Sequence, residues 1–288
     1  MIKNEILNII DTLCRNNYHI NVFTTAERGD AETIVLNETS QNDLIICCGG
    51  DGTFNEIVSG CMKLPAEYKI PPIGYIPSGT TNDMAATLNL PVDVKTAVSD
   101  IIIGNEHRID IGSFNADKYF TYVASFGAFT KTSYTTPQQL KNTLGHFAYV
   151  IEGIREMRNI RPYNMSVKCD NCEIEGDFIF GSVTNSTSIG GIIKLKSPRI
   201  DLSDGMFEVV LIRQPQNPIE MNSLIFNISS QNFQNDKNIL FIHTSSVNFI
   251  VNEPAALPWT IDGEYAGDYD CVKIQNLFKA ITILKADN

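Results

Sequence analysis

The first ninety residues alternate helical and strand-like hydrophobic patterns. Ile6, Ile10 and Leu13 fall on one helical face, so a helix is expected at the start. Strand-like patterns are predicted at 19–24, 44–48 and 73–76, of which 44–48 is a continuous apolar run, and helical periodicity predicts helices at 31–38, 54–64 and 83–90. This alternation predicts a parallel sheet with crossover connections, whose ligand site lies at the carboxyl ends of the strands.

From Arg108 onward the pattern changes to paired short strands, expected at 110–114, 119–125, 163–168 and 173–183. Their short turns predict a mainly antiparallel second half. An amphipathic helix is expected over 140–154, with its apolar stripe facing a core. We therefore expect two domains, 1–107 and 108–276, and leave open whether residues 277–288 return to the first.

The charge and the apolar content of the sequence argue against some classes of function. The chain has 22 Lys and Arg against 33 Asp and Glu, a net charge of -11, which argues against a nucleic-acid binder. Neither a signal-peptide pattern nor a run of 18 apolar residues is present, so we expect a cytoplasmic protein without a transmembrane segment.

The seven cysteines are an odd number, and we expect them to be reduced core residues rather than a disulfide framework. Only Cys169 and Cys172 have metal-ligand spacing. The dipeptide between them, Asp170-Asn171, favours a plain hairpin tip over a metal or redox site.

Gly49-Gly50-Asp51-Gly52-Thr53 follows a predicted buried strand and precedes a predicted helix. Glycines let a phosphate approach the backbone, and the N–H groups and dipole of a helix N-terminus favour an anion. The Walker and dinucleotide-binding spacings are both absent. Asp51 and Glu56 add acidic groups that a plain turn would not need, so a phosphate site is the favoured interpretation.

A second glycine-bearing turn, Pro77-Ser78-Gly79-Thr80-Thr81-Asn82-Asp83, follows the next strand. Asn82 or Asp83 is suited to cap the helix that follows. Because the two turns follow adjacent parallel strands, we expect them to lie side by side as two walls of a nucleotide site.

Together with Asp262-Gly263-Glu264 far downstream, these two motifs resemble the diacylglycerol kinase catalytic-domain family, in particular its soluble bacterial lipid kinases. The NAD kinases of this superfamily share the first motif. The resemblance implies an N-terminal α/β domain that binds ATP and a C-terminal antiparallel β-sandwich that supplies the lipid site. It also implies an ATP- and Mg2+-dependent kinase that converts diacylglycerol to phosphatidic acid.

The resemblance also assigns roles to residues. It implies catalytic roles for Asp262 and Glu264, of which either is the candidate base, and a structural magnesium site at Asp204 with the carbonyls of Asp201 and Met206. From its residues alone, without the resemblance, the 201–205 segment is equally well explained as a hydrogen-bonded turn. Because neither phosphate turn contains Lys or Arg, we expect Asp51 to hold a catalytic magnesium ion. The expected nucleotide-binding residues are Thr25, Gly49, Gly50, Asp51, Gly52, Thr53, Asn55, Glu56, Gly79, Thr80, Asn82 and Asp83.

The start of the sequence departs from the family pattern. Members of the family open with a strand and an Asn-Pro-x-Ser-Gly-like turn that contacts the phosphates, whereas this sequence begins in the helix that follows. The strand is either truncated from the sequence or absent. We expect a lipid substrate reached by peripheral contact with the inner membrane face, with a homodimer left open. The alternatives are a NAD-kinase-like small-molecule kinase and a noncatalytic nucleotide-binding regulatory protein.

Overall fold

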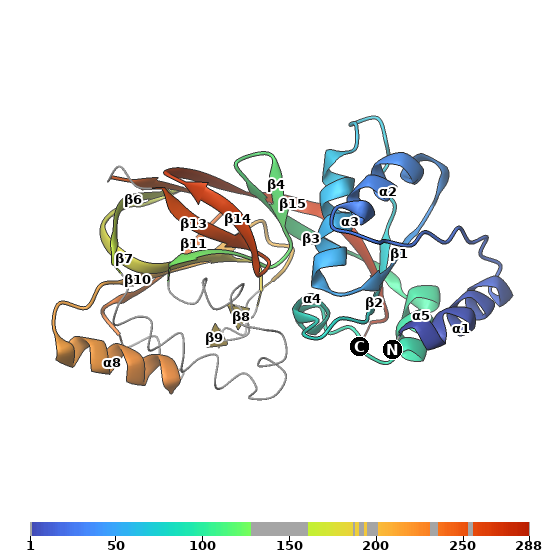
Figure 1. The fold of residues 1–288 in the computed structure, drawn as a ribbon, viewed down its shortest axis with the longest axis horizontal. Helices are drawn as coiled ribbons and strands as arrows, with labels where there is room; N and C mark the ends of the chain where they lie inside the picture. The colour runs from blue at the N-terminus through green and yellow to red at the C-terminus, as the bar shows by residue number, and fades with distance from the viewer. Residues whose placement is uncertain are drawn as a thin grey trace. The chain divides into compact units, whose positions relative to one another are not determined.

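The computed structural model describes residues 2–127, 161–186, 188–189, 193–194, 201–230, 236–252 and 256–287. The chain forms two compact units, Met1–Ile111 with Phe278–Asn288, and Gly112–Leu277 (Figure 1). Strands β3 (Asn105–Phe114) and β15 (Cys271–Lys285) pair with each other and continue from one unit into the other. The helix expected over 140–154 lies outside the described residues.

The first unit is built on parallel strands. β1 (Ile45–Gly49) pairs with β2 (Ile73–Pro77) in parallel along their whole length, and β2 pairs in parallel with β15 through Ile73 and Ile283. Helix α3 (Asp51–Lys63) makes the crossover from β1 to β2. The expected α/β sheet is therefore confirmed.

Helices cover both faces of this sheet. α1 (Ile2–Arg15) and α5 (Val94–Ile103) share one apolar cluster with the sheet, in which Ile9 and Leu13 of α1 meet Ile76 of β2. α2 (Asp30–Glu38) packs on α3, whose Phe54 ring stacks on Tyr75 of β2 at 4.7 Å between centroids. The remaining elements are the short helices η1 (Thr39–Gln41) and α4 (Asp83–Thr87).

Two expectations for this unit are wrong. Residues 19–24 form no strand, and they have no paired strand on either side in the described part of the chain. An apolar extended segment becomes a strand only when a neighbour accepts its backbone hydrogen bonds. Helix α3 begins at Asp51, three residues before the expected start at Phe54, so the second half of the glycine motif is already helical.

The second unit is antiparallel, as expected. Its strands pair in the order β12-β6-β7-β5-β13-β14, and β10 pairs with both β7 and β11. The element bounds are β4 (Lys118–Phe120), β5 (Val123–Gly127), β6 (Tyr163–Cys169), β7 (Glu173–Thr184), β8 (Ser188–Ile189), β9 (Ile193–Lys194), β10 (Phe207–Arg213), α8 (Pro218–Ser229), β11 (Ile239–Thr244), β12 (Ser246–Val251), β13 (Leu257–Ile261) and β14 (Glu264–Tyr269).

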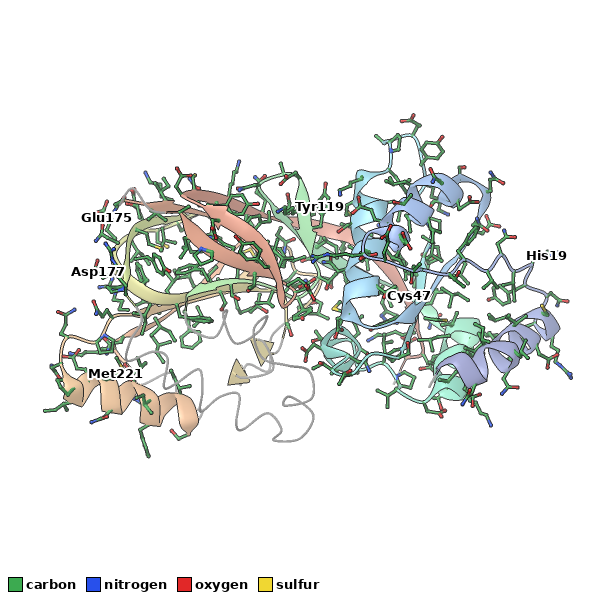
Figure 2. All side chains as sticks on the ribbon, in the orientation of Figure 1. His19, Cys47, Tyr119, Glu175, Asp177 and Met221 are labelled. Atoms are coloured by element: carbon green, nitrogen blue, oxygen red, sulfur yellow. The ribbon has the colours of Figure 1, made fainter. Side chains whose placement is uncertain are left out.

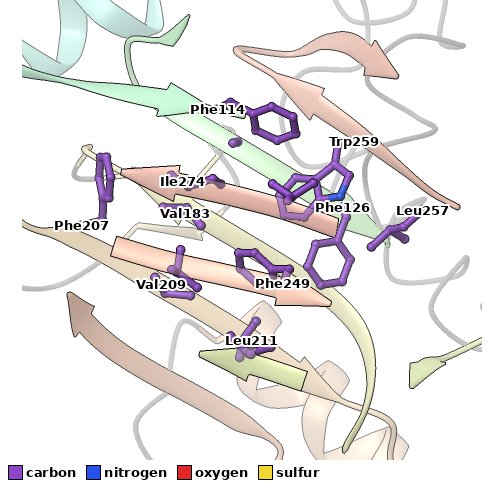
Figure 3. Packing of buried hydrophobic residues seen from close by; sticks show 14 of the residues in the cluster. Phe114, Phe126, Val183, Phe207, Val209, Leu211, Phe249, Leu257, Trp259 and Ile274 are labelled. Atoms are coloured by element: carbon purple, nitrogen blue, oxygen red, sulfur yellow. The ribbon is translucent and has the colours of Figure 1, made fainter. Parts of the chain in front are cut away.

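Trp259 of β13 lies at the centre of an aromatic core in this unit (Figure 3). Its ring lies 5.4 Å from Phe114, 4.9 Å from Phe126 and 5.1 Å from Phe249, between ring centroids. These rings come from β3, β5 and β12, so the core holds strands that are far apart in sequence. Offset and edge-to-face ring pairs of this kind add to the hydrophobic stabilisation.

Asp170-Asn171 joins β6 to β7, so the hairpin tip expected there is confirmed. The strand expected over 119–125 is divided at Thr121 and Tyr122, between β4 and β5. All seven cysteines are free thiols, but Cys14 and Cys271 are exposed, contrary to the expectation that all belong to the core. No helix in the described ranges has the length and apolar character needed to cross a bilayer.

Candidate functional site

The first phosphate turn is the N-terminus of α3 itself. β1 ends at Gly49, Gly50 is the N-cap residue, and the cap has no side-chain hydrogen bond. A Cβ atom added at Gly52 would meet no heavy atom within 4 Å, so this position faces open space. The first N–H groups of a helix have no intrahelical partner, and they carry the positive end of its dipole. Figure 2 shows Cys47 on the strand that leads into this turn.

The second turn lies directly against the first. A Cβ atom at Gly79 would approach the Gly50 Cα atom to 2.7 Å, and Ser78 N donates to the Gly49 carbonyl oxygen at 2.8 Å. Only glycine permits this approach of the two backbones. Gly79 and Thr80 are exposed. The two glycine-bearing turns therefore lie against each other at the carboxyl ends of β1 and β2, with Gly52, Gly79 and Thr80 exposed.

Asp51 links the two turns. Its Oδ2 atom accepts a hydrogen bond from Asp83 N at 3.1 Å, and its Oδ1 atom accepts one from Met84 N at 3.0 Å. The carboxylate of the first turn thus caps α4, which follows the second turn. Asn82 occupies the N-cap position but makes no side-chain cap bond, and Asp83 is the first helical residue, so the expectation that one of them caps α4 is wrong. Asn82 instead binds Gly79 N and O at 2.9 and 3.0 Å and closes the turn.

The other expected nucleotide residues have separate surroundings. Glu56 accepts hydrogen bonds from Gly29 N at 2.9 Å and Ala31 N at 3.2 Å, so it caps the N-terminus of α2. Asn55 is partly buried in α3 beside Ser59. Thr25 is exposed and lines a cavity together with Thr53.

Sequence reasoning did not anticipate Tyr75. Its hydroxyl is buried and has no hydrogen-bond partner among the described residues. Burial, and then the charge of Asp51, raise the pKa of Tyr75, so the phenol stays protonated and remains a donor. Only the closeness in space of Asp51 and strand β2 marks this residue, and that closeness is visible in the structure rather than in the sequence.

The acid pair of the second unit lies in a tight turn between β13 and β14. Asp262 and Gly263 both have positive φ, 47° and 82°, as expected for a two-residue hairpin turn. Asp262 is 8% exposed, whereas Glu264 is exposed. The two neighbouring carboxylates therefore have opposite environments.

Asp262 is saturated with hydrogen bonds. Its Oδ2 atom accepts from Thr121 N and Thr121 Oγ1, both at 2.8 Å, and its Oδ1 atom accepts from Tyr122 N at 3.1 Å and Val123 N at 3.0 Å. Thr121 and Tyr122 form the break between β4 and β5, and Val123 is the first residue of β5. Burial raises the pKa of Asp262, and the hydrogen bonds oppose that rise. Asp262 therefore holds the β4–β5 connection, and Thr121 is its unanticipated partner.

The expected metal loop is folded on itself. Asp201 Oδ1 accepts from Ser203 N and Oγ at 3.0 and 2.7 Å, and Asp204 Oδ1 accepts from Met206 N at 2.9 Å. Asn276 Nδ2 donates to the Met206 carbonyl oxygen at 3.2 Å. These are the bonds of a hydrogen-bonded turn. In the described ranges, no group of three or more His, Cys, Asp or Glu side chains is arranged to hold a metal ion.

Two residues that sequence reasoning missed lie beside this loop. His243 Nε2 is 3.5 Å from Asp204 Oδ2 and 3.9 Å from Glu208 Oε1. Burial, with the charge of Asp204 as the second cause, raises the pKa of Glu208 to about 7. Asp204 Oδ2 and the Glu208 carboxylate thus face the same imidazole, and they are hard oxygen ligands of the kind that magnesium prefers.

Comparison with known proteins identifies the two parts of the chain. The diacylglycerol kinase catalytic domain profile matches residues 1–114, and a profile described as the YegS C-terminal NAD kinase beta sandwich-like domain matches residues 124–285. A diacylglycerol kinase from Bacillus subtilis (strain 168) is 32% identical over 268 residues, covering 92% of this chain and 86% of the relative. A diacylglycerol kinase from Staphylococcus saprophyticus is 30% identical, covering 93% and 85%.

Solved structures agree on the fold. A diacylglycerol kinase structure from Bacillus anthracis str. Sterne superposes with a TM-score of 0.69 at 21% identity, covering 92% of this chain and 84% of that one. Another structure from the same organism gives a TM-score of 0.79 at 22% identity, covering 98% and 92%. The family resemblance and the expected fold class are confirmed. The chain belongs to the diacylglycerol kinase family, whose catalytic domain is followed here by a YegS-type C-terminal domain.

Proposed function

We propose that this lipid kinase transfers the γ-phosphoryl group of ATP to the free hydroxyl of diacylglycerol or a related lipid, giving phosphatidic acid and ADP. One observation carries the nucleotide half of the proposal: two glycine turns, exposed at Gly52 and Gly79, lie against each other at the ends of adjacent parallel strands. The named activity of the relatives supports the lipid acceptor.

The phosphates would bind at the α3 N-terminus. Gly50, Gly52 and Thr53 offer main-chain N–H groups, and a helix N-terminus carries about +0.5 elementary charge. Gly79 and Thr80 would complete the phosphate surface, and Thr25 would contact the nucleotide. The backbone around this surface is held by contacts of Gly49, Asn82 and Asp83. Asn55 would contact the nucleotide from the first turns of α3, and Glu56 acts indirectly by fixing α2.

Glu264 is the base that we propose for the lipid hydroxyl. An exposed carboxylate is accessible to a substrate proton, whereas each Asp262 oxygen already accepts two hydrogen bonds. The hydroxyl oxygen forms a bond to the γ-phosphorus as the bond to the β–γ bridging oxygen breaks. The hydroxyl proton passes to Glu264, and ADP is the leaving group. Asp262 positions the turn that carries the base.

Magnesium supplies positive charge to the phosphate oxygens when it is bound with ATP. Asp51 would hold it through lone pairs that its two cap bonds leave unused. The structural ion would be held by Asp204 Oδ2, with the Asp201 and Met206 carbonyls. Glu208 is the additional carboxylate on that side of the loop.

The decisive experiment is an acceptor screen of the purified protein with labelled ATP and Mg2+. Diacylglycerol in mixed micelles, other lipid alcohols, NAD and a no-acceptor control are compared. Label in phosphatidic acid is the expected result. Label in NADP would establish the NAD-kinase alternative, and ATP binding without transfer to any acceptor would establish the regulatory alternative.

A further inference from the structure

Two strongly exposed apolar side chains lie on helix α8 of the second unit (Figure 1). Ile219 is 81% exposed and Phe226 is 68% exposed. They are seven residues apart, so they project from the same face of the helix, about 10 Å apart along its axis. The opposite face carries the buried side chains of Leu224 and Ile228. Helix α8 is therefore apolar on two opposite faces, and one of them faces outward.

Within α8, no ionised side chain interrupts the outward face. Its other members are Asn222 and Ser223, with Ser230 just beyond the helix, and all three are exposed and uncharged. The one ionisable residue of α8 is Glu220, whose side chain is 17% exposed. Lys237 Nζ lies 2.9 Å from its Oε1 atom and neutralises it. This face is therefore electrically neutral in a chain whose net charge is -11.

Both ends of α8 are capped, so the helix holds the two apolar side chains in fixed positions. Asn217 Oδ1 accepts hydrogen bonds from Ile219 N at 3.1 Å and from Glu220 N at 3.0 Å. At the other end, Ser230 Oγ donates to the Phe226 carbonyl oxygen at 2.8 Å. A helix with satisfied ends presents its side chains without a further ordering cost.

The small apolar area of this face favours a bilayer over a protein partner. A stable protein–protein interface buries about 800 Å2 on each partner, and more than half of that area is apolar. Two exposed side chains of this size offer on the order of 300 Å2. A second copy of the chain would therefore gain too little apolar contact here. A bilayer needs no such area, since lipid surrounds each protruding side chain separately.

We infer that the outward face of α8 docks on the bilayer that holds the lipid acceptor, with Ile219 and Phe226 inserted between the lipid headgroups. The inference rests on the proposed lipid-kinase function, which requires contact with a bilayer. An interfacial helix buries its apolar side chains about 5–10 Å into the boundary between headgroups and acyl chains. A neutral face is also the part of an anionic chain that an anionic membrane repels least.

The lipid composition of the bilayer should control this docking. Diacylglycerol carries only a hydroxyl where a phospholipid carries a phosphate headgroup, so it leaves gaps through which apolar side chains reach the acyl chains. Phosphatidic acid fills such a gap with a phosphate, whose negative charge repels a chain of charge -11. The substrate therefore strengthens the contact and the product weakens it, so the enzyme leaves a membrane whose diacylglycerol it has consumed.

The first measurement places a fluorophore on this face with Phe226→Trp in the whole chain. Trp259 is the single natural tryptophan and is 1% exposed, so its emission should not respond to vesicles. On phosphatidylcholine vesicles that contain diacylglycerol, the added emission should shift to shorter wavelength and be quenched by brominated acyl chains. Vesicles that contain phosphatidic acid instead should bind more weakly. No binding to the diacylglycerol vesicles, or binding without the shift and the quenching, would overturn the inference.

Two matched double variants test the side chains themselves. Ile219→Ser with Phe226→Ser should weaken binding to diacylglycerol vesicles at least tenfold, because both inserted groups are lost. The control is Leu7→Ser with Ile103→Ser, on α1 and α5, at residues that are 77% and 69% exposed. It should bind vesicles as the parent does. Equal weakening in both, or loss of a dimer in the α8 variant with vesicle binding intact, would contradict docking of α8 on a bilayer.

Turnover separates the docking inference from the proposed function. The parent and the α8 double variant are compared on diacylglycerol in vesicles and on monomeric short-chain diacylglycerol in water. The variant should lose at least tenfold more turnover on vesicles than on the monomeric acceptor. An equal loss on both acceptors would disprove the docking role. A parent protein that phosphorylates neither acceptor would instead contradict the lipid-kinase proposal, whatever the vesicle binding shows.

Discussion

At the scale of single residues, Asp262 and Glu264 are separated by one glycine, and only Asp262 is enclosed by the protein. Four hydrogen bonds bind its carboxylate to the β4–β5 connection. A base must reach its substrate proton within hydrogen-bond distance, and an anchor must not move. The two side chains therefore suit different tasks, and substitution should separate them.

We expect Glu264→Gln to lower kcat by roughly 100- to 10,000-fold, with ATP affinity and Tm nearly unchanged, because it removes a base. Asp262→Asn should mainly cost stability, about 2 kcal/mol, because its amide group cannot accept from all four donors. Turnover on diacylglycerol, ATP titration and thermal unfolding are measured for both variants. A Glu264→Gln enzyme with normal kcat would disprove the assignment of the base.

Gly52→Val tests the phosphate turn. The added side chain meets no protein atom within 4 Å at its Cβ, so the variant should keep a Tm within a few degrees of the parent. The same side chain occupies the space proposed for phosphate, and ATP affinity should fall by at least about tenfold, or 1.4 kcal/mol. Calorimetric titration checks this. The contrasting variant is Gly79→Ala, whose Cβ would meet Gly50 at 2.7 Å, and it should lose stability as well as ATP binding.

At the scale of elements, most helices and strands follow from hydrophobic periodicity, and the failures have physical causes. The segment 19–24 has the pattern of a strand but pairs with no other strand among the described residues, and pairing is not a local property. The strand expected over 119–125 breaks at Thr121 because Asp262, far away in sequence, accepts its N–H group. The two glycine turns were found from sequence, since their motifs are local, but the bridging role of Asp51 depends on three-dimensional proximity.

The β6–β7 hairpin is tied to the β11–β12 turn by Asp170. Its carboxylate accepts from Ser245 N, Ser245 Oγ and Ser246 Oγ at 2.6, 2.8 and 2.7 Å. The two serine hydroxyls are the main cause of a pKa for Asp170 well below its ordinary value. A lowered pKa adds stability above the unfolded-state pKa, and this stability is lost as the pH falls towards the folded-state value.

We therefore expect Asp170→Asn to lower Tm by a few degrees at pH 7, and the difference from the parent to shrink as the pH falls below about 4. Thermal unfolding across pH 3 to 8 measures it. Asp268→Asn, at an exposed position of β14, controls for loss of one negative charge. A Tm difference that is constant with pH would show that the ionised carboxylate is not the stabilising species.

The Asp201–Met206 loop is tested through magnesium and stability. If Asp204 holds a structural ion, Mg2+ should raise the Tm of the parent protein, because the ion binds only the folded state. Asp204→Ala should remove that shift, while ATP affinity stays near the parent value. The same shift in parent and variant would leave the loop as the hydrogen-bonded turn that its contacts form.

At the scale of the whole molecule, the net charge would oppose the peripheral contact with an anionic membrane that the sequence predicts. A charge of -11 is repelled by anionic lipid, and salt screens this repulsion over a Debye length of about 8 to 10 Å. Binding to vesicles rich in anionic lipid should therefore strengthen, by up to several-fold, between about 0.05 and 0.5 M salt. Vesicle co-sedimentation measures it, with neutral vesicles as the control. Binding that weakens with salt would reveal a local basic surface that outweighs the net charge.

Asp51 changes how mutants of this protein should be interpreted. Its carboxylate joins the first glycine turn to the start of α4, so it braces the phosphate surface whether or not it also holds a metal. Loss of activity in Asp51→Ala would therefore follow equally from loss of this contact with α4 or from loss of a bound cation. Asp51→Asn keeps an acceptor oxygen for one of the two N–H groups. The dependence of its residual activity on manganese would therefore separate the structural role of Asp51 from metal binding. A screen that scores only loss of function does not distinguish these two roles.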